Sequence, residues 1–186
     1  MNKKIRWITE SAAMLALLIC LQWVGSMIPS PMVKQLVTGS CVNAVLAVTA
    51  LVVGWSAGCN VALISPLIAY LLGIAPQALT GPAIMLGNTV YVVLLYVIAG
   101  KDSKKVFRQI AGWLTAAVAK FVTLYAVVVW LICGVFAPQL MESGTLKAPM
   151  LKALPATFSW PQLVTALIGG AIALAITPVL RKALHK

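Results

Sequence analysis

The sequence predicts an all-α integral membrane protein with six transmembrane helices, both termini in the cytoplasm, and a single transmembrane domain over residues 1–186. Two observations carry this prediction. Hydrophobic residues make up 62% of the chain and charged residues only 9%, whereas a soluble domain has about 45–50% apolar and about 25% charged residues. The net charge of +11 would suggest a nucleic-acid partner in a soluble protein, but in a membrane protein it reports orientation. We therefore expect a lipid bilayer around the chain and no nucleic acid.

Six apolar stretches are candidates for the membrane spans. A hydrocarbon core of ~30 Å needs about 20 apolar residues in a helix. The stretches cover residues 7–27, 37–53, 57–72, 82–99, 110–136 and 161–180. Gly54 and Gly58 are turn signals between the second and third stretches. The join is short and uncharged, so five spans remain an alternative if these two stretches form one bent helix.

Basic residues set the expected orientation. They cluster before the first stretch, between the fourth and fifth, and after the sixth: Lys3, Lys4, Arg6; Lys101, Lys104, Lys105, Arg108; Arg181, Lys182, Lys186. With six spans all three clusters fall on one side, and cytoplasmic loops carry the excess of Lys and Arg. Five spans would put the last cluster outside.

The scarcity of catalytic side chains argues against an enzyme. The acids are Glu10, Asp102 and Glu142 in three distant segments, and His185 is the single histidine. A carboxylate pair, a catalytic triad and a metal site are therefore not expected, and neither is a cofactor. The chain has no phosphate-binding GxxxxGK[ST] loop. If ATP drives its function, another subunit must hydrolyse it.

Lys120 is the sharpest candidate for a functional residue. It lies about ten residues into the fifth stretch, ~15 Å along a helix. A lysine near the bilayer centre normally faces protein, water or a ligand. We expect it to line a pocket or to bind an anion. The alternatives are a structural lysine, bonded to helix carbonyls or to Glu10, and a side chain that reaches for the lipid headgroups.

Other polar side chains gather toward the predicted outer ends of the helices. They are Gln35, Thr38, Asn43, Asn88, Tyr91, Tyr125, Gln162 and Thr165, with Trp160 as an aromatic candidate. Polar side chains at such depths bond across helices or line a cavity, and Trp160 either anchors at the membrane interface or stacks on a planar ligand. Their shared bias favours one pocket. The outer connections are residues 28–36, 74–81 and 137–158, and the third is long enough to be functional or disordered. After it, Ser159 and Gln162 predict a helix-initiating capping box.

Four segments resemble a known family. They are residues 35–43 (QLVTGSCVN), 85–88 (MLGN), 120–125 (KFVTLY) and 159–165 (SWPQLVT). Together with the basic N-terminus, the Ala-x-x-x-Ala at Ala12 and Ala16, the six short spans and the length, they are similar to the substrate-binding S component of an energy-coupling factor (ECF) transporter. The similar group includes folate, pantothenate and cobalamin carriers.

The resemblance implies a partner complex and a function. An S component binds a vitamin or vitamin-like micronutrient from outside and docks on a transmembrane scaffold subunit that sits on two ATPases. Docking would use Ala12 and Ala16, and the pocket would form from the outer halves of spans four to six with the three outer loops. From the residues themselves we also expect a neutral or anionic ligand, because Glu142 is the only acid within reach of the expected pocket. An autonomous secondary transporter remains the alternative, although such carriers usually need a carboxylate or histidine within the membrane.

Overall fold

The computed structural model describes residues 2–74, 78–100 and 106–184, and these residues form helices and no strand. The longer helices are α1 (Lys3–Ser26), α2 (Pro31–Val48), α3 (Trp55–Leu71), α4 (Gly81–Ala99), α5 (Val106–Leu124) and α8 (Trp160–Leu184). The π-helical segments Thr49–Val53 and Tyr125–Val135 extend α2 and α5, and the 3-10 turn Ala78–Thr80 precedes α4. The short helices are α6 (Ala137–Glu142) and α7 (Ala148–Thr157). Gln77, Lys101, Asp102, Lys104, Lys105, His185 and Lys186 lie outside the described residues.

Five helical stretches are long and apolar enough to cross a membrane. They are Lys3–Ser26, Pro31–Val53, Ala78–Ala99, Val106–Val135 and Trp160–Ala183. The remaining predicted span forms α3, a separate apolar helix of 17 residues that contains Pro66. The prediction of an all-α membrane protein is confirmed, and five of its six spans meet the length of a membrane crossing.

The chain reverses direction at Gly54, between α2 and α3. Gly54 has φ +136°, a backbone conformation that side chains with a Cβ rarely adopt. Its N–H donates to the Thr49 carbonyl and closes the π-helical segment. The start of α2 and the end of α3 consequently reach the same cavity. The alternative of one continuous bent helix over residues 37–72 is therefore wrong.

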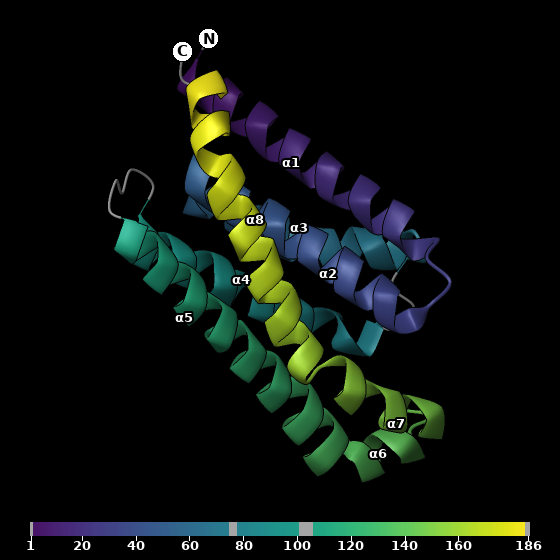
Figure 1. The fold of residues 1–186 in the computed structure, drawn as a ribbon. Helices are drawn as coiled ribbons and strands as arrows, with labels where there is room; N and C mark the ends of the chain where they lie inside the picture. Colours follow the sequence, from purple (N-terminus) through teal and green to yellow (C-terminus); the bar gives the residue numbers. More distant parts are fainter. Residues whose placement is uncertain (1, 75–77, 101–105, 185–186) are drawn as a thin grey trace.

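The start of α1 and the end of α8 lie at one end of the molecule, and α6 and α7 lie at the other (Figure 1). Two arginine side chains tie helix ends together near the first of these ends. Arg181 Nη2 donates to the Leu51 carbonyl over 2.8 Å, which joins α8 to the end of the second span. Arg108 Nε donates to the Ile98 carbonyl over 3.1 Å and joins α5 to α4.

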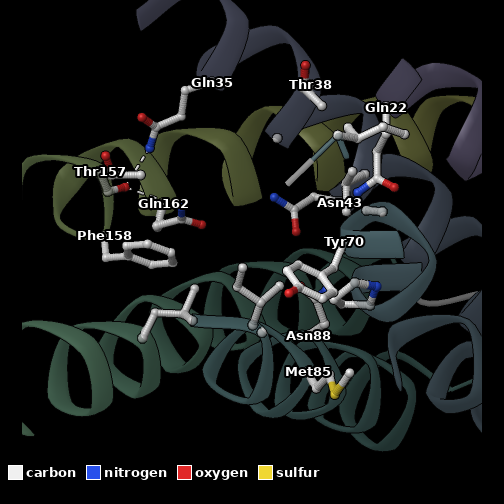
Figure 2. A pocket seen from close by; sticks show the side chains of 18 of the residues that line it. Gln22, Gln35, Thr38, Asn43, Tyr70, Met85, Asn88, Thr157, Phe158 and Gln162 are labelled. Carbon is white, nitrogen blue, oxygen red and sulfur yellow. Dashed lines mark hydrogen bonds between the residues drawn. The ribbon is translucent and has the colours of Figure 1, made fainter. Parts of the chain in front are cut away.

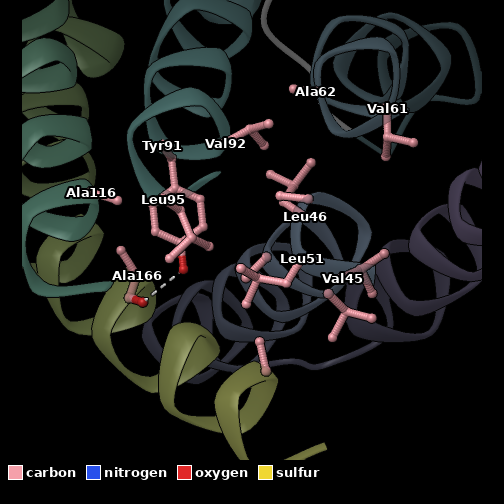
Figure 3. Packing of buried hydrophobic residues seen from close by; sticks show 14 of the residues in the cluster. Val45, Leu46, Leu51, Val61, Ala62, Tyr91, Val92, Leu95, Ala116 and Ala166 are labelled. Carbon is pink, nitrogen blue, oxygen red and sulfur yellow. Dashed lines mark hydrogen bonds between the residues drawn. The ribbon is translucent and has the colours of Figure 1, made fainter. Parts of the chain in front are cut away.

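Two apolar clusters hold the helices together. The larger one lies among α1, α2, α3, α4, α5 and α8, and includes Leu46, Leu51, Val92 and Leu95 around the buried Tyr91 (Figure 3). α1 contributes Leu18 to this cluster, and Leu18 and Gly25 are the only buried residues of α1. α1 therefore lies on the outside of the bundle and presents most of its surface to its surroundings.

The third outer connection is helical, whereas the sequence predicted a long loop. Residues 137–158 form α6 and α7, and a second apolar cluster packs Leu146, Leu154 and Phe158 against Leu124 and Val128. The spacing of these leucines inside a proline-rich segment gave no clear helical pattern, so their burial decided the structure.

The predicted capping box at the start of α8 is absent. The Ser159 hydroxyl donates to the Ala156 carbonyl over 3.3 Å, and Gln162 Nε2 donates to the Thr157 carbonyl over 3.3 Å. Both side chains bond backward to the end of α7 because α7 packs directly before α8. A capping box would need them to bond the first turn of α8.

Candidate functional site

A cavity of about 720 Å³ opens against α5, among the ends of α1, α2, α3, α4, α7 and α8 that lie away from the chain termini (Figure 2). This volume lies within the range of about 300–1,000 Å³ of sites that hold small organic ligands. Its polar lining residues are Gln22, Lys34, Gln35, Thr38, Asn43, Tyr70, Asn88, Lys120, Thr157 and Gln162. Its walls are mainly apolar and include Val42, Pro66, Met85, Leu124 and Phe158.

Lys120 lies in the wall of this cavity and is bonded to two amides. Its Nζ lies 2.6 Å from Asn43 Oδ1 and 2.6 Å from Asn88 Oδ1, on α2 and α4. The side chain is only 3% exposed. An ammonium group has three N–H donors, and among the described residues these two oxygens are its hydrogen-bond partners. One donor is left for another acceptor.

Neither alternative for Lys120 named the partners that the structure shows. Glu10 bonds Arg6, with Arg6 Nε 2.7 Å from Glu10 Oε1, and does not reach Lys120. Lys120 points into the bundle, which excludes a side chain stretched toward lipid headgroups. Its contacts are amide oxygens and the face of Tyr91, whose ring centroid lies 5.6 Å from Nζ.

A second layer of hydrogen bonds fixes the groups around Lys120. Asn43 Nδ2 donates to Thr165 Oγ1 over 3.3 Å, and the Thr165 hydroxyl donates to the Gln162 carbonyl over 3.1 Å. Because its NH₂ group is held by α8, Asn43 directs its oxygen toward Lys120. The Tyr91 hydroxyl donates to the Ala166 carbonyl over 3.4 Å. Four helices thus position one ammonium group.

The described lining of the cavity carries positive charge and no carboxylate. Lys34 joins Lys120 in the lining, and Lys34 Nζ donates to the Ser26 carbonyl at the end of α1 over 3.2 Å. Asp and Glu are absent from the described lining residues. No three His, Cys, Asp or Glu side chains of the described chain lie close enough to hold a metal ion. The site therefore suits acceptor groups and anions better than cations.

The end of α7 covers one side of the cavity. The Thr157 carbonyl, at the last residue of α7, accepts hydrogen bonds from Gln35 Nε2 of α2 and Gln162 Nε2 of α8 (Figure 2). The last carbonyls of a helix have no hydrogen-bond donor within the helix. Here the side chains of two glutamines from neighbouring helices supply the donors. Phe158 follows and is buried against the same cavity.

Most of the side chains predicted for the site meet at this cavity. Gln35, Thr38, Asn43, Asn88, Lys120 and Gln162 line it, and Tyr91 and Thr165 contact Lys120 and Asn43 from behind. Tyr125 and Trp160 are 45% and 53% exposed and lie outside the lining. Tyr125 follows Lys120 by five residues, about 140° around an α-helix, so its side chain leaves the helix on another face than Lys120 does.

Sequence reasoning missed the contributions of the first and third helices. Gln22 of α1 and Tyr70 of α3 line the cavity, although the pocket was expected from spans four to six and the outer loops. Gln22 carried a usable signal, because it is a polar side chain inside an apolar stretch. Tyr70 and Phe158 carried none, since aromatic residues are ordinary in apolar segments.

Comparison with known families agrees with this architecture. The family of the ECF transporter, substrate-specific component, matches residues 10–181. The chain belongs to this family. No match is found among curated proteins or among solved structures. The resemblance to an S component is thus confirmed over nearly the whole chain, and it covers every helix that lines the cavity.

As an S component, the chain is a multi-pass protein of the cell membrane, and its family is a family of transporter components rather than of enzymes. The two alanines implied in docking lie on the outside of the S component. Ala12 and Ala16 are both exposed and lie one turn apart, on the face of α1 that points away from the bundle.

Proposed function

We propose that this S component is the high-affinity binding subunit of an ECF-type ABC importer for a vitamin or vitamin-like micronutrient that is neutral or anionic. One observation carries the proposal. A cavity of about 720 Å³ contains a buried lysine that bonds two neutral amides and keeps a donor free for a ligand. A lysine without a carboxylate partner leaves its charge uncompensated, which favours an acceptor or an anion in the cavity.

The surroundings of the cavity support the same sign of ligand. Lys34 adds a second positive charge to the lining. The first turns of α2 and α4 reach the cavity through Pro31 and Pro82, and a helix N-terminus carries partial positive charge. The amides of Gln35, Asn88 and Gln162 suit a ligand with polar groups, such as a heterocycle or a carboxamide.

The proposed topology has six membrane crossings and both termini in the cytoplasm. The start of α1 and the end of α8 lie at the same end of the molecule, which an even number of crossings requires (Figure 1). Arg6, Arg108 and Arg181 belong to that end, as cytoplasmic basic residues should. α3 supplies the sixth crossing although it is short, and the cavity then opens to the outside.

The proposed partners are a transmembrane scaffold subunit and two ATPases. The chain has no phosphate-binding loop of its own, so ATP hydrolysis has to come from other subunits. The exposed face of α1 at Ala12 and Ala16 lets another helix approach closely, because small side chains allow tight helix packing in membranes.

Native mass spectrometry of the detergent-purified protein tests the binding function. The protein is incubated with pantothenate, folate, riboflavin, biotin and cobalamin at equal concentrations, and bound compounds are identified by mass. We expect one stoichiometric adduct that Lys120→Met removes. Absence of any adduct on the wild-type protein would contradict the proposed function. Capture of a scaffold and two ATPases from the native membrane tests the partnership separately.

A further inference from the structure

Thr165 of α8 lies behind the cavity wall, next to a residue that holds the Lys120 ammonium group. Thr165 is 1% exposed and does not belong to the lining of the cavity. Its hydroxyl accepts a hydrogen bond from Asn43 Nδ2 over 3.3 Å and donates one to the Gln162 carbonyl over 3.1 Å. Any effect of this hydroxyl on a bound compound therefore passes through Asn43.

The Thr165 hydroxyl can bond only one end of the Asn43 amide. A hydroxyl has a single O–H donor, and Thr165 uses it on the Gln162 carbonyl. Toward Asn43 it is an acceptor, so it has to face the NH₂ group of the amide. The oxygen of Asn43 then points to Lys120, whose Nζ lies 2.6 Å from Oδ1. The reverse orientation would set an NH₂ group against an ammonium group, which has no acceptor.

Close packing of α2 and α8 surrounds this hydrogen bond. A Cβ at Gly39 of α2 would lie 2.9 Å from Thr165 Cγ2, so the two helices touch at Thr165. One turn later on α8, Gly169 meets the backbone of Ser40 in the same way. The bond between Thr165 and Asn43 therefore lies inside a tight contact between two helices, where interior packing leaves little freedom to rearrange.

We propose that Thr165 is a positioning residue for ligand binding: its hydroxyl fixes the amide of Asn43, which holds the Lys120 ammonium where its remaining donor reaches the transported compound. The inference rests on the proposed function and deepens it, because it adds a residue that controls affinity without touching the compound. The hydroxyl carries this role, so serine should be able to replace threonine at this position.

Three variants of Thr165 test the role of the hydroxyl. Thr165→Val keeps the shape of the side chain, and it should bind the compound that the wild-type protein retains about threefold to tenfold more weakly, the value of one hydrogen bond. Thr165→Ser should bind as tightly as the wild-type protein. Thr165→Ala differs from Thr165→Ser only by the hydroxyl and should lose as much affinity as Thr165→Val, so this pair decides if Thr165→Val does not fold.

The matched control is Thr177→Val on the same helix. Thr177 is also buried, and among the described residues its hydroxyl donates to the Ala173 carbonyl of its own helix over 2.6 Å. The control removes a buried hydroxyl from α8 without removing a bond to another helix, so its affinity should not change. The assay is titration of each purified protein with the compound, followed by native mass spectrometry. The melting temperature of each ligand-free protein shows that it is folded.

A double variant with Lys120→Met separates positioning from a general structural role. If Thr165 acts through the ammonium group, Thr165→Val should add little to the loss caused by Lys120→Met, measured at raised concentrations of the compound. An undiminished further loss in that background would overturn the positioning role. So would wild-type affinity of Thr165→Val, a loss in Thr165→Ser equal to that in Thr165→Ala, or an equal loss in Thr177→Val. Each of these results leaves the proposed function standing, whereas a wild-type protein that retains no compound contradicts the proposed function itself.

Discussion

Gly169 of α8 packs directly against the backbone of Ser40 on α2. A Cβ at Gly169 would lie 2.5 Å from the Ser40 carbonyl oxygen and 2.6 Å from Asn43 Cβ. The two helices therefore approach each other without an intervening side chain. Since Asn43 lies in this contact and also accepts a hydrogen bond from Lys120, the helix crossing sets the position of the binding group.

Gly169→Ala should therefore damage both stability and binding. The added methyl group would press against the backbone of Ser40, which cannot move aside as a flexible side chain can. Such overpacking lowers the stability of a protein by about 1–3 kcal/mol. We expect a lower melting temperature in detergent and a weaker affinity for the retained compound. Gly134→Ala is the control, because the nearest atom to its Cβ would lie 3.7 Å away. Equal melting of the two variants would contradict the tight contact.

Lys120→Met should weaken binding of an anionic compound by more than tenfold. The variant loses the ammonium group and leaves the oxygens of Asn43 and Asn88 without their donor. It should also destabilise the protein, by about 1–3 kcal/mol for each buried acceptor left unpaired. Titration of purified protein measures the affinity, and Lys152→Met on the exposed side of α7 is the control. An unchanged affinity would return Lys120 to a structural role.

Asn88→Asp should reduce anion binding while keeping the fold. The new carboxylate takes the place of the amide oxygen 2.6 Å from Lys120 and neutralises the charge of the ammonium group. We expect at least a tenfold loss for an anionic compound and little loss for a neutral one, since the attraction to the anion is cancelled. Gln139→Glu makes the same chemical change outside the cavity. Equal losses for neutral and anionic compounds would point to misfolding instead.

Gln35→Met together with Gln162→Met should speed release of a bound compound. The double variant removes both donors to the Thr157 carbonyl and frees the end of α7 over the cavity. Each hydrogen bond stabilises the closed arrangement by about 0.5–1.5 kcal/mol, so the dissociation rate should rise by about tenfold. Stopped-flow release of the compound measures it. A dissociation rate equal to that of the wild-type protein would show that α7 does not hold the cavity closed.

Ala12→Trp with Ala16→Trp should abolish docking and spare ligand binding. Both alanines are exposed on α1, and neither belongs to the cavity lining. Two indole groups prevent the close helix approach that small residues permit. Co-purification of the scaffold and ATPase subunits is the measurement, and Ala175→Trp on the exposed side of α8 is the control. Retained capture by the double variant would remove this face of α1 from the interface.

The sequence alone determined the class of protein and the central residue of the cavity. The excess of apolar residues requires a membrane, because only lipid tolerates so many apolar side chains at the surface. A lysine near the middle of an apolar helix is costly enough to require polar partners or a ligand, which is why Lys120 stood out in the sequence. Its bonds to Asn43 and Asn88 came from the structure. Each of these signals lies within one stretch of the sequence, so it can be recognised without knowing which helices pack together.

Tertiary structure alone decided what shares the cavity with Lys120. The reversal at Gly54 brings Tyr70 of α3 to the cavity that α2 lines, and burial of Leu146 and Leu154 folds a predicted loop into α6 and α7. The contact between Gly25 and Thr38 brings Gln22 into the wall. These outcomes depend on packing between segments far apart in the chain, and helical periodicity within one segment carries no information about its partner.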